Sequence, residues 1–173
     1  MTNQRSDSLF VDDERRRIDA AAPVPFAPNA FGLRFSGMIS TDCYRGFWVD
    51  FELDGNSFKI KELRLAVHPG DRDEVLHGKL FDREPNDVNE FDVTSRDIPL
   101  AYTGKLVVGL GKKSAPTKWN RTKEIFCFED GGLISRQKME LRELPEEFTP
   151  SSVWLDYGVM LWIPPDPHEL ENP

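Results

Sequence analysis

The fold of this chain is decided by residues 31–67, which read FGLRFSGMISTDCYRGFWVDFELDGNSFKIKELRLAV. From Phe47 to Leu53, apolar residues alternate with Trp, Asp and Glu. Successive side chains of a strand point to opposite faces, so this alternation predicts a strand with one apolar face. The residues Asp-Gly-Asn follow at 54–56. Because Gly and Asn accept the positive φ of a tight turn, they predict a hairpin over residues 44–66.

The second half of this hairpin contains an irregularity that has a physical meaning. The alternation resumes at Phe58 and Ile60, but the next apolar residue is Leu63 rather than residue 62. A shift of one residue would turn the apolar side chains to the wrong face. We therefore expect a bulge around Lys61-Glu62 that restores the register.

Composition limits the classes of protein to which the chain can belong. Its 173 residues suit one domain, which at this size can build a core without disulfides. The net charge of −8 argues against non-specific binding to nucleic acid, which depends on neutralising phosphates. No apolar run reaches the length of a membrane span. The two cysteines, Cys43 and Cys127, are too few for a disulfide framework. With no secretory signal visible, we expect reduced thiols and a cytoplasmic location.

The chain divides into three parts on composition. Residues 1–30 are expected to form a flexible N-terminal arm, with a short helix over Val11–Ala22 and then a Pro-rich linker. Residues 31–165 are expected to be a single β domain, and residues 166–173 an acidic, Pro-containing tail. Within the domain, the expected extended segments are Arg34–Ile39, the hairpin 44–66, Glu74–Phe81, Phe91–Leu100, Thr103–Leu110, Glu124–Phe128, Leu133–Leu141 and 153–163.

Short strands separated by Gly, Pro and Asp turns are typical of all-β folds. We therefore predict a mainly β protein, a single antiparallel barrel or sandwich of about eight strands, with the N-terminal helix or disordered arm outside it. The sequence does not distinguish the barrel from the sandwich.

Enzyme motifs are absent from the sequence. No G-x-S-x-G, CxxC, HExxH or P-loop pattern occurs, so we expect no metal and no cofactor. His77 is the best placed histidine for a general base, although a structural role is favoured. Asp50 and Glu52 would share one face beside Trp48, and paired carboxylates can act as acid and base. An outward polar face gives the same pattern.

Two segments are candidate binding surfaces. The polar loop 112–123 combines basic residues with an isolated tryptophan, a combination found at protein hot spots and on single-stranded nucleic acid. The loop 82–90 is acidic, although a solvated loop is favoured over a calcium site because it lacks the required Gly and Glu positions. The residues that we select as binding candidates are Trp119, Lys112, Lys113, Arg121, Asp82, Glu84, Asp87 and Glu90.

Three functions remain compatible with the sequence. The first is a non-enzymatic protein-binding module, for example of the immunity or adaptor type, whose acidic faces would attract a basic protein partner. This class assignment is an analogy between compact acidic β domains and carries no diagnostic residues. The second is a barrel that carries a small apolar ligand. The third is an uncharacterised enzyme that uses carboxylates. We expect neither a membrane nor nucleic acid as a partner.

Overall fold

The computed structural model of the protein describes residues 7–26, 46–68, 70, 85–88, 93–110, 121–141 and 145–150. These residues form strands and turns, with no α-helix among them. In the described part of the chain, no helix has the length and hydropathy required to span a membrane. The strands are β1 (Ser8–Val11), β2 (Glu14–Ala22), β3 (Phe47–Asp54), β4 (Ser57–Leu65), β5 (Asp87–Val88), β6 (Val93–Pro99), β7 (Gly104–Gly109), β8 (Arg121–Glu129), β9 (Gly132–Leu141) and β10 (Thr149–Pro150).

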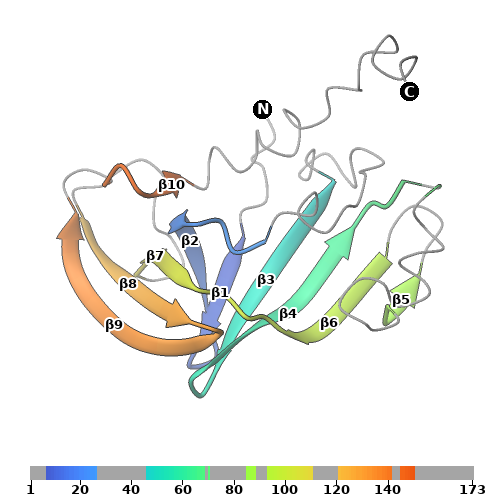
Figure 1. Cartoon of the computed structure of the whole chain (residues 1–173), viewed down its shortest axis with the longest axis horizontal. Coiled ribbons are helices and arrows are strands. Elements are labelled where there is room, and N and C mark those ends of the chain that lie inside the picture. The colour runs from blue at the N-terminus through green and yellow to red at the C-terminus, as the bar shows by residue number, and fades with distance from the viewer. Residues whose placement is uncertain are drawn as a thin grey trace, which may run out of the picture.

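Seven of these strands close into a barrel, which decides between the two predicted architectures (Figure 1). The order around the barrel is β3-β1-β2-β7-β8-β9-β4, and the pairing of β3 with β4 closes it. β6 and β5 extend the sheet from β4, and β10 pairs with β2. The prediction of an antiparallel sheet needs one correction, because β1 and β3 are parallel.

The predicted hairpin of residues 44–66 is confirmed as β3 and β4. Asp50 lies opposite Glu62 and Phe51 opposite Ile60, so Lys61 is the extra residue of a bulge. The bulge lies where the apolar spacing breaks, and it keeps Ile60 and Leu63 buried, with exposed fractions of 0% and 1%.

The second predicted hairpin, β8 with β9, is also confirmed, and β8 is longer than expected. Residues 121–123 were expected in a polar loop, but they begin β8. The turn between the strands contains Asp130 and Gly131, both with positive φ. Glu129 pairs with Gly132 across this turn, as in a two-residue hairpin. β6 and β7 confirm the extended segments expected over 91–100 and 103–110.

The expected N-terminal helix and arm are wrong. Residues 8–22 form β1 and β2, and both strands belong to the barrel. Leu9, Val11 and Ile18 point into the core and are at most 1% exposed. The acidic and basic residues that indicated a solvated helix form the turn of this hairpin and its ion pairs instead. The Pro-rich linker expected over residues 22–30 is wrong in its described part, because Phe26 is 3% exposed and belongs to the core. Residues 27–30, the strands expected at 34–39, 74–81 and 153–163 and the tail at 166–173 lie outside the described residues.

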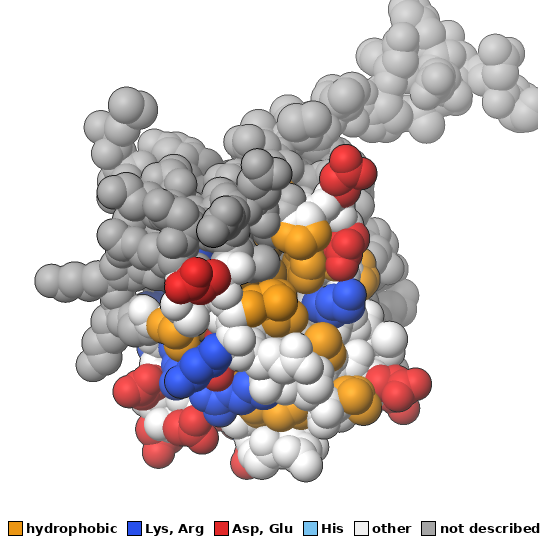
Figure 2. Space-filling model, turned by 90° about the vertical axis from the view of Figure 1, so that its left-hand side faces the viewer, with side chains coloured by type: hydrophobic (Ala, Val, Ile, Leu, Met, Phe, Trp, Pro, Cys, Tyr) orange, Lys and Arg blue, Asp and Glu red, His pale blue; other side chains and the backbone are white. Residues whose placement is uncertain are grey.

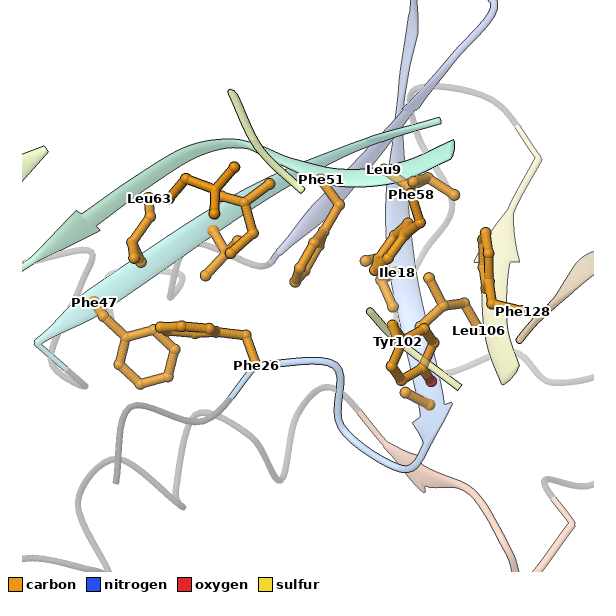
Figure 3. Packing of buried hydrophobic residues seen from close by; sticks show 14 of the residues in the cluster. Leu9, Ile18, Phe26, Phe47, Phe51, Phe58, Leu63, Tyr102, Leu106 and Phe128 are labelled. Atoms are coloured by element: carbon orange, nitrogen blue, oxygen red, sulfur yellow. The ribbon is translucent and has the colours of Figure 1, made fainter. Parts of the chain in front are cut away.

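Aromatic side chains fill the described interior of the barrel (Figure 3). The Phe58 ring lies 5.1 Å from that of Phe51, 5.3 Å from that of Tyr102 and 4.6 Å from that of Phe128, measured between centroids. These distances are those of direct ring packing. Towards the other end, Phe26 packs edge-on against Phe47 at 5.7 Å. The Tyr102 hydroxyl lies 2.7 Å from the Pro23 carbonyl oxygen, which ties the β6–β7 connection to the end of β2.

Candidate functional site

The outer surface of the barrel has two faces of opposite character. The outer face of β3, β4 and β6 is covered by ion pairs, each within 3.1 Å: Arg15 with Asp50, Lys61 with Glu52, Lys59 with Glu52, and Arg96 with both Glu62 and Asp87. We call these residues the ion-pair ladder. Each charged side chain in it has a side chain of opposite charge beside it. The charges of this face are paired with one another and solvated, so little unpaired charge is left with which to recognise a partner.

The two carboxylates that were candidate catalytic groups belong to this ladder. Asp50 Oδ1 lies 3.1 Å from an Arg15 amino group, and Glu52 accepts hydrogen bonds from Lys61 and Lys59. The Lys61 ammonium in particular lowers the pKa of Glu52 below its usual value. A general acid needs a raised pKa, so this environment does not suit Glu52 to that role.

The outer face of β2, β7 and β8 is apolar instead. Leu106 and Val108 point into the main core, and Val107 between them points outward into a separate cluster. The Phe148 side chain, from the segment before β10, covers this cluster. We define the outer apolar face by these outward residues and their neighbours on β8 and β9: Ala20, Ala22, Val107, Ile125, Cys127, Ile134, Met139 and Phe148.

Figure 2 views the molecule from the side of β8 and β9. Hydrophobic side chains gather in the middle of this side, Lys and Arg side chains lie beside them, and Asp and Glu side chains lie towards the margin. Ala20, Val107 and Phe148 of this face are themselves buried, so its exposed large apolar side chains among the described residues are Ile134, at 63%, and Met139, at 39%.

A groove of about 530 Å³ crosses the outer apolar face. Its floor is formed by the ends of β7 and β8, and Glu147 lies on its rim. Its lining consists of Ala22, Thr103, Gly104, Lys105, Cys127, Phe128, Glu129, Ile134 and Glu147. Cys127 is a free thiol, half-buried in this lining.

Ile134 is the most exposed large apolar side chain of the described residues, at 63%. Its exposure has a local cause. Cys127 pairs with Ser135 and Phe128 with Leu133, so Ile134 is the extra residue of a bulge. A bulge turns one side chain away from the regular alternation. Leu133 therefore packs on the core while Ile134, next to it in sequence, lines the outer groove.

The charge around the groove is predominantly negative. Among the described residues that line it, Lys105 is the only cation, and its ammonium lies 3.1 Å from Glu147. Glu129 also lines the groove and makes no ion pair with any described residue. A second acidic surface, a cleft of about 350 Å³ lined in part by Asp12, Asp13, Glu52 and Asp54, lies between the β1–β2 and β3–β4 turns.

Glu124 forms a buried charge cluster between β2, β8 and β9. It is 2% exposed, and its carboxylate lies 2.5 Å from Arg16 Nη1 and 2.8 Å from Arg136 Nε. Glu14 and Asp12 neutralise the outer nitrogens of the two arginines at the rim. Because both arginines are already bound to carboxylates, we assign this cluster a structural role.

A second buried pair, between Asp19 and Lys123, lies under the outer apolar face. The two side chains are 2% and 3% exposed, and Lys123 Nζ lies 2.7 Å from Asp19 Oδ2. Burial raises the pKa of Asp19 above its usual value, against the opposing effect of Lys123. Lys123 belonged to the expected polar loop, but its position in β8 makes it part of the support for this face.

Of the binding residues predicted from the sequence, the structure describes Asp87 and the backbone of Arg121. Asp87 lies in β5, where its carboxylate pairs with Arg96 at 2.9 Å. Arg121 begins β8, and its side chain is outside the description. The remaining candidates, Trp119, Lys112, Lys113, Asp82, Glu84 and Glu90, lie outside the described residues, as do His77 and Cys43.

Sequence reasoning missed the groove, although one signal for it was present. Leu133 and Ile134 are adjacent apolar residues near the start of a strand, and the next four residues, 135–138, are polar. In a strand such a pair either spans both faces or marks a bulge. The contribution of Lys105 and Glu147 had no local signal, since these residues are 42 apart in sequence.

Comparison of the chain with protein-family models, with curated proteins and with solved structures finds no match.

Proposed function

We propose that this protein is a non-enzymatic protein-binding module that docks its partner on the outer apolar face. The observation that carries the proposal is the groove, together with the Ile134 side chain, which lines it and is 63% exposed. Anchoring contacts in protein interfaces are apolar side chains packed into such hollows and surrounded by a polar rim. The cytoplasmic location expected from the sequence belongs to the same proposal.

The rim favours a partner of particular chemistry. Lys105 is engaged by Glu147, which leaves Glu129 as the unpaired charge of the groove among the described residues. The whole chain carries a net charge of −8, which would attract a basic surface over a longer range. We therefore expect the partner to present an apolar side chain next to Lys or Arg.

The other two functions have less support. A carrier of an apolar ligand needs space inside the barrel, and the described interior is occupied by Phe51, Phe58, Tyr102 and Phe128 in direct contact. A carboxylate enzyme needs an acid with a raised pKa in an accessible site, whereas Glu52 has a lowered pKa and two lysine partners.

The proposal can be tested with a random dodecapeptide phage library selected on the immobilised full chain. We expect enriched peptides to contain a large apolar residue flanked by Lys or Arg. Their affinity should fall at least tenfold, or about 1.4 kcal/mol, in an Ile134→Glu variant. Val88→Glu is the matched control, because Val88 is also exposed, at 44%, but lies in β5.

Two results would contradict the proposal. One is a selection that enriches no peptide from a folded bait. The other is a set of peptides that bind Ile134→Glu as tightly as the unmodified chain. Loss of binding in Val88→Glu alone would move the docking surface to the ion-paired face.

A further inference from the structure

One edge of β9 is not paired with any described strand over most of its length. On one side it pairs with β8 along its whole length, from Gly132 to Leu141. On the other side its pairing with β4 is limited to Gly132 opposite Ser57, after which β4 pairs with β6. Figure 1 shows β9 and β4 diverging from this point. No described segment pairs with the far edge of β9 beyond Leu133.

This edge is long and regular. The bulge at Ile134 lies at its beginning, and the pairing with β8 continues without interruption from Ser135 to Leu141. Natural sheets protect such edges with charged side chains, with proline, with bulges or by covering or pairing them, because unpaired N–H and C=O groups recruit another strand. The charged side chains of this edge, Arg136, Lys138 and Glu140, include both signs, so a second copy can pair with them in a suitable register. Residues 135–141 contain no proline. Met139 lies in the middle of the second half of β9, residues 137–141, and is 39% exposed.

From this edge we propose that the protein forms a symmetric dimer in which β9 pairs antiparallel with β9 of a second copy, centred on Met139. A two-fold axis perpendicular to the sheet places one residue opposite itself, and its neighbours then oppose one another in turn. When the axis passes through Met139, Lys138 of each copy lies opposite Glu140 of the other copy. Gln137 of each copy likewise lies opposite Leu141 of the other.

The charges of β9 select this register. Centring the pair on Arg136, Lys138 or Glu140 would place that residue opposite its own copy. Centring it on Gln137 would place Arg136 opposite Lys138. Like charges directly opposite each other destabilise a sheet, and opposite charges stabilise it. Met139 is therefore the one centre between residues 136 and 140 that gives attraction instead of repulsion.

The side chains needed for this pairing are available. Lys138 and Glu140 are exposed and make no ion pair with any described residue. Arg136 is already neutralised by Glu124 and Asp12, so it does not compete for Glu140. The five residues from Gln137 to Leu141 exclude Ile134, so the dimer would leave the groove open. The dimer would cover Met139 of the outer apolar face but leave Ile134 and the groove lining accessible. The two proposals have separate readouts, because the dimer is tested by the mass of the chain and the docking function by the affinity of peptides for Ile134→Glu.

The test is the mass of the full chain in solution, measured by light scattering and sedimentation across the micromolar range. We expect the unmodified chain to shift from monomer to dimer with concentration. Lys138→Glu should place two glutamates opposite each other, and Glu140→Lys two lysines. Each variant alone should dimerise at least tenfold more weakly.

Combining the variants makes the test specific to the register. An equimolar mixture of Lys138→Glu and Glu140→Lys restores both opposite pairs, so the two should form a heterodimer. The double variant should dimerise like the unmodified chain. Glu146→Lys, an exposed charge reversal away from β9, is the control for net charge and should dimerise like the unmodified chain. Unfolding midpoints of all the variants would establish that they are folded.

Three outcomes would overturn the inference. The first is a chain that remains monomeric throughout the micromolar range. The second is dimerisation that neither charge reversal weakens, which would place the interface elsewhere. The third is a mixture that does not form heterodimers although each variant alone is monomeric, which would exclude the register centred on Met139.

Discussion

Glu124 shows how much a single charged residue contributes to this barrel. Its carboxylate is buried and is held by Arg16 and Arg136, both of which come from other strands. Removing one member of a buried ionic cluster leaves the other charges without compensation, at a cost of about 3–5 kcal/mol. We expect Glu124→Gln to lower the free energy of unfolding by about 3 kcal/mol, measured by urea denaturation.

The matched control for this prediction is Glu62→Gln. Glu62 also pairs with an arginine, Arg96, at 2.8 Å, but the two side chains are 32% and 43% exposed. An exposed pair contributes about 0–1 kcal/mol, so the control should change stability little. Equal losses in the two variants would show that the burial of Glu124 has no energetic consequence.

Residues such as Glu124 also mark where sequence reasoning ends. Arg16 and Glu124 are 108 residues apart, and Asp19 and Lys123 are 104 apart. A charged residue beside other charges is usually solvated, so local pattern alone places Arg16 and Asp19 in a solvated segment. The strand order brings their distant partners to them, because β7 pairs with both β2 and β8.

At the scale of elements, the two hairpin turns provide a matched pair of glycines. Gly55 and Gly131 both have positive φ, 60° and 77°. A Cβ at Gly55 would meet nothing within 4 Å, whereas one at Gly131 would lie 2.5 Å from the Leu100 carbonyl oxygen. Alanine at either position incurs the left-handed penalty of about 1 kcal/mol. At Gly131, crowding against backbone adds about 1–3 kcal/mol.

We therefore expect Gly131→Ala to lower the free energy of unfolding by about 3 kcal/mol and Gly55→Ala by about 1 kcal/mol. Chemical denaturation of the two variants measures both values. If Gly55→Ala cost as much as Gly131→Ala, the tight approach of the β8–β9 turn to Leu100 would be excluded as the cause.

The hairpins were predictable because their information is local. Alternation and a Gly-containing turn specify β3 with β4 and β8 with β9, and the break between Ile60 and Leu63 even locates the bulge at Lys61. The groove depends instead on residues from β2, β7, β8 and β9 and from the segment before β10. Its assembly follows from strand order, which no local pattern encodes.

At the scale of the whole molecule, the decisive difference from the sequence-based prediction is the role of residues 8–22. β1 joins β3 to β2, so the barrel cannot close without it. The parallel pairing of β1 with β3 also has no signature in either segment, because it joins strands about forty residues apart across an intervening stretch.

The importance of β1 and β2 can be tested by truncation. Leu9, Val11 and Ile18 are fully buried, and burial of each such side chain contributes about 1.5–3 kcal/mol. Their sum is comparable to the whole stability of a typical domain, about 5–15 kcal/mol. A chain that begins at residue 23 should therefore lose its cooperative unfolding transition and its near-ultraviolet circular dichroism. A chain that begins at Asp7 keeps both strands and should unfold cooperatively. If the shorter chain retained a cooperative transition of similar midpoint, β1 and β2 would be an appendage to the barrel rather than two of its walls.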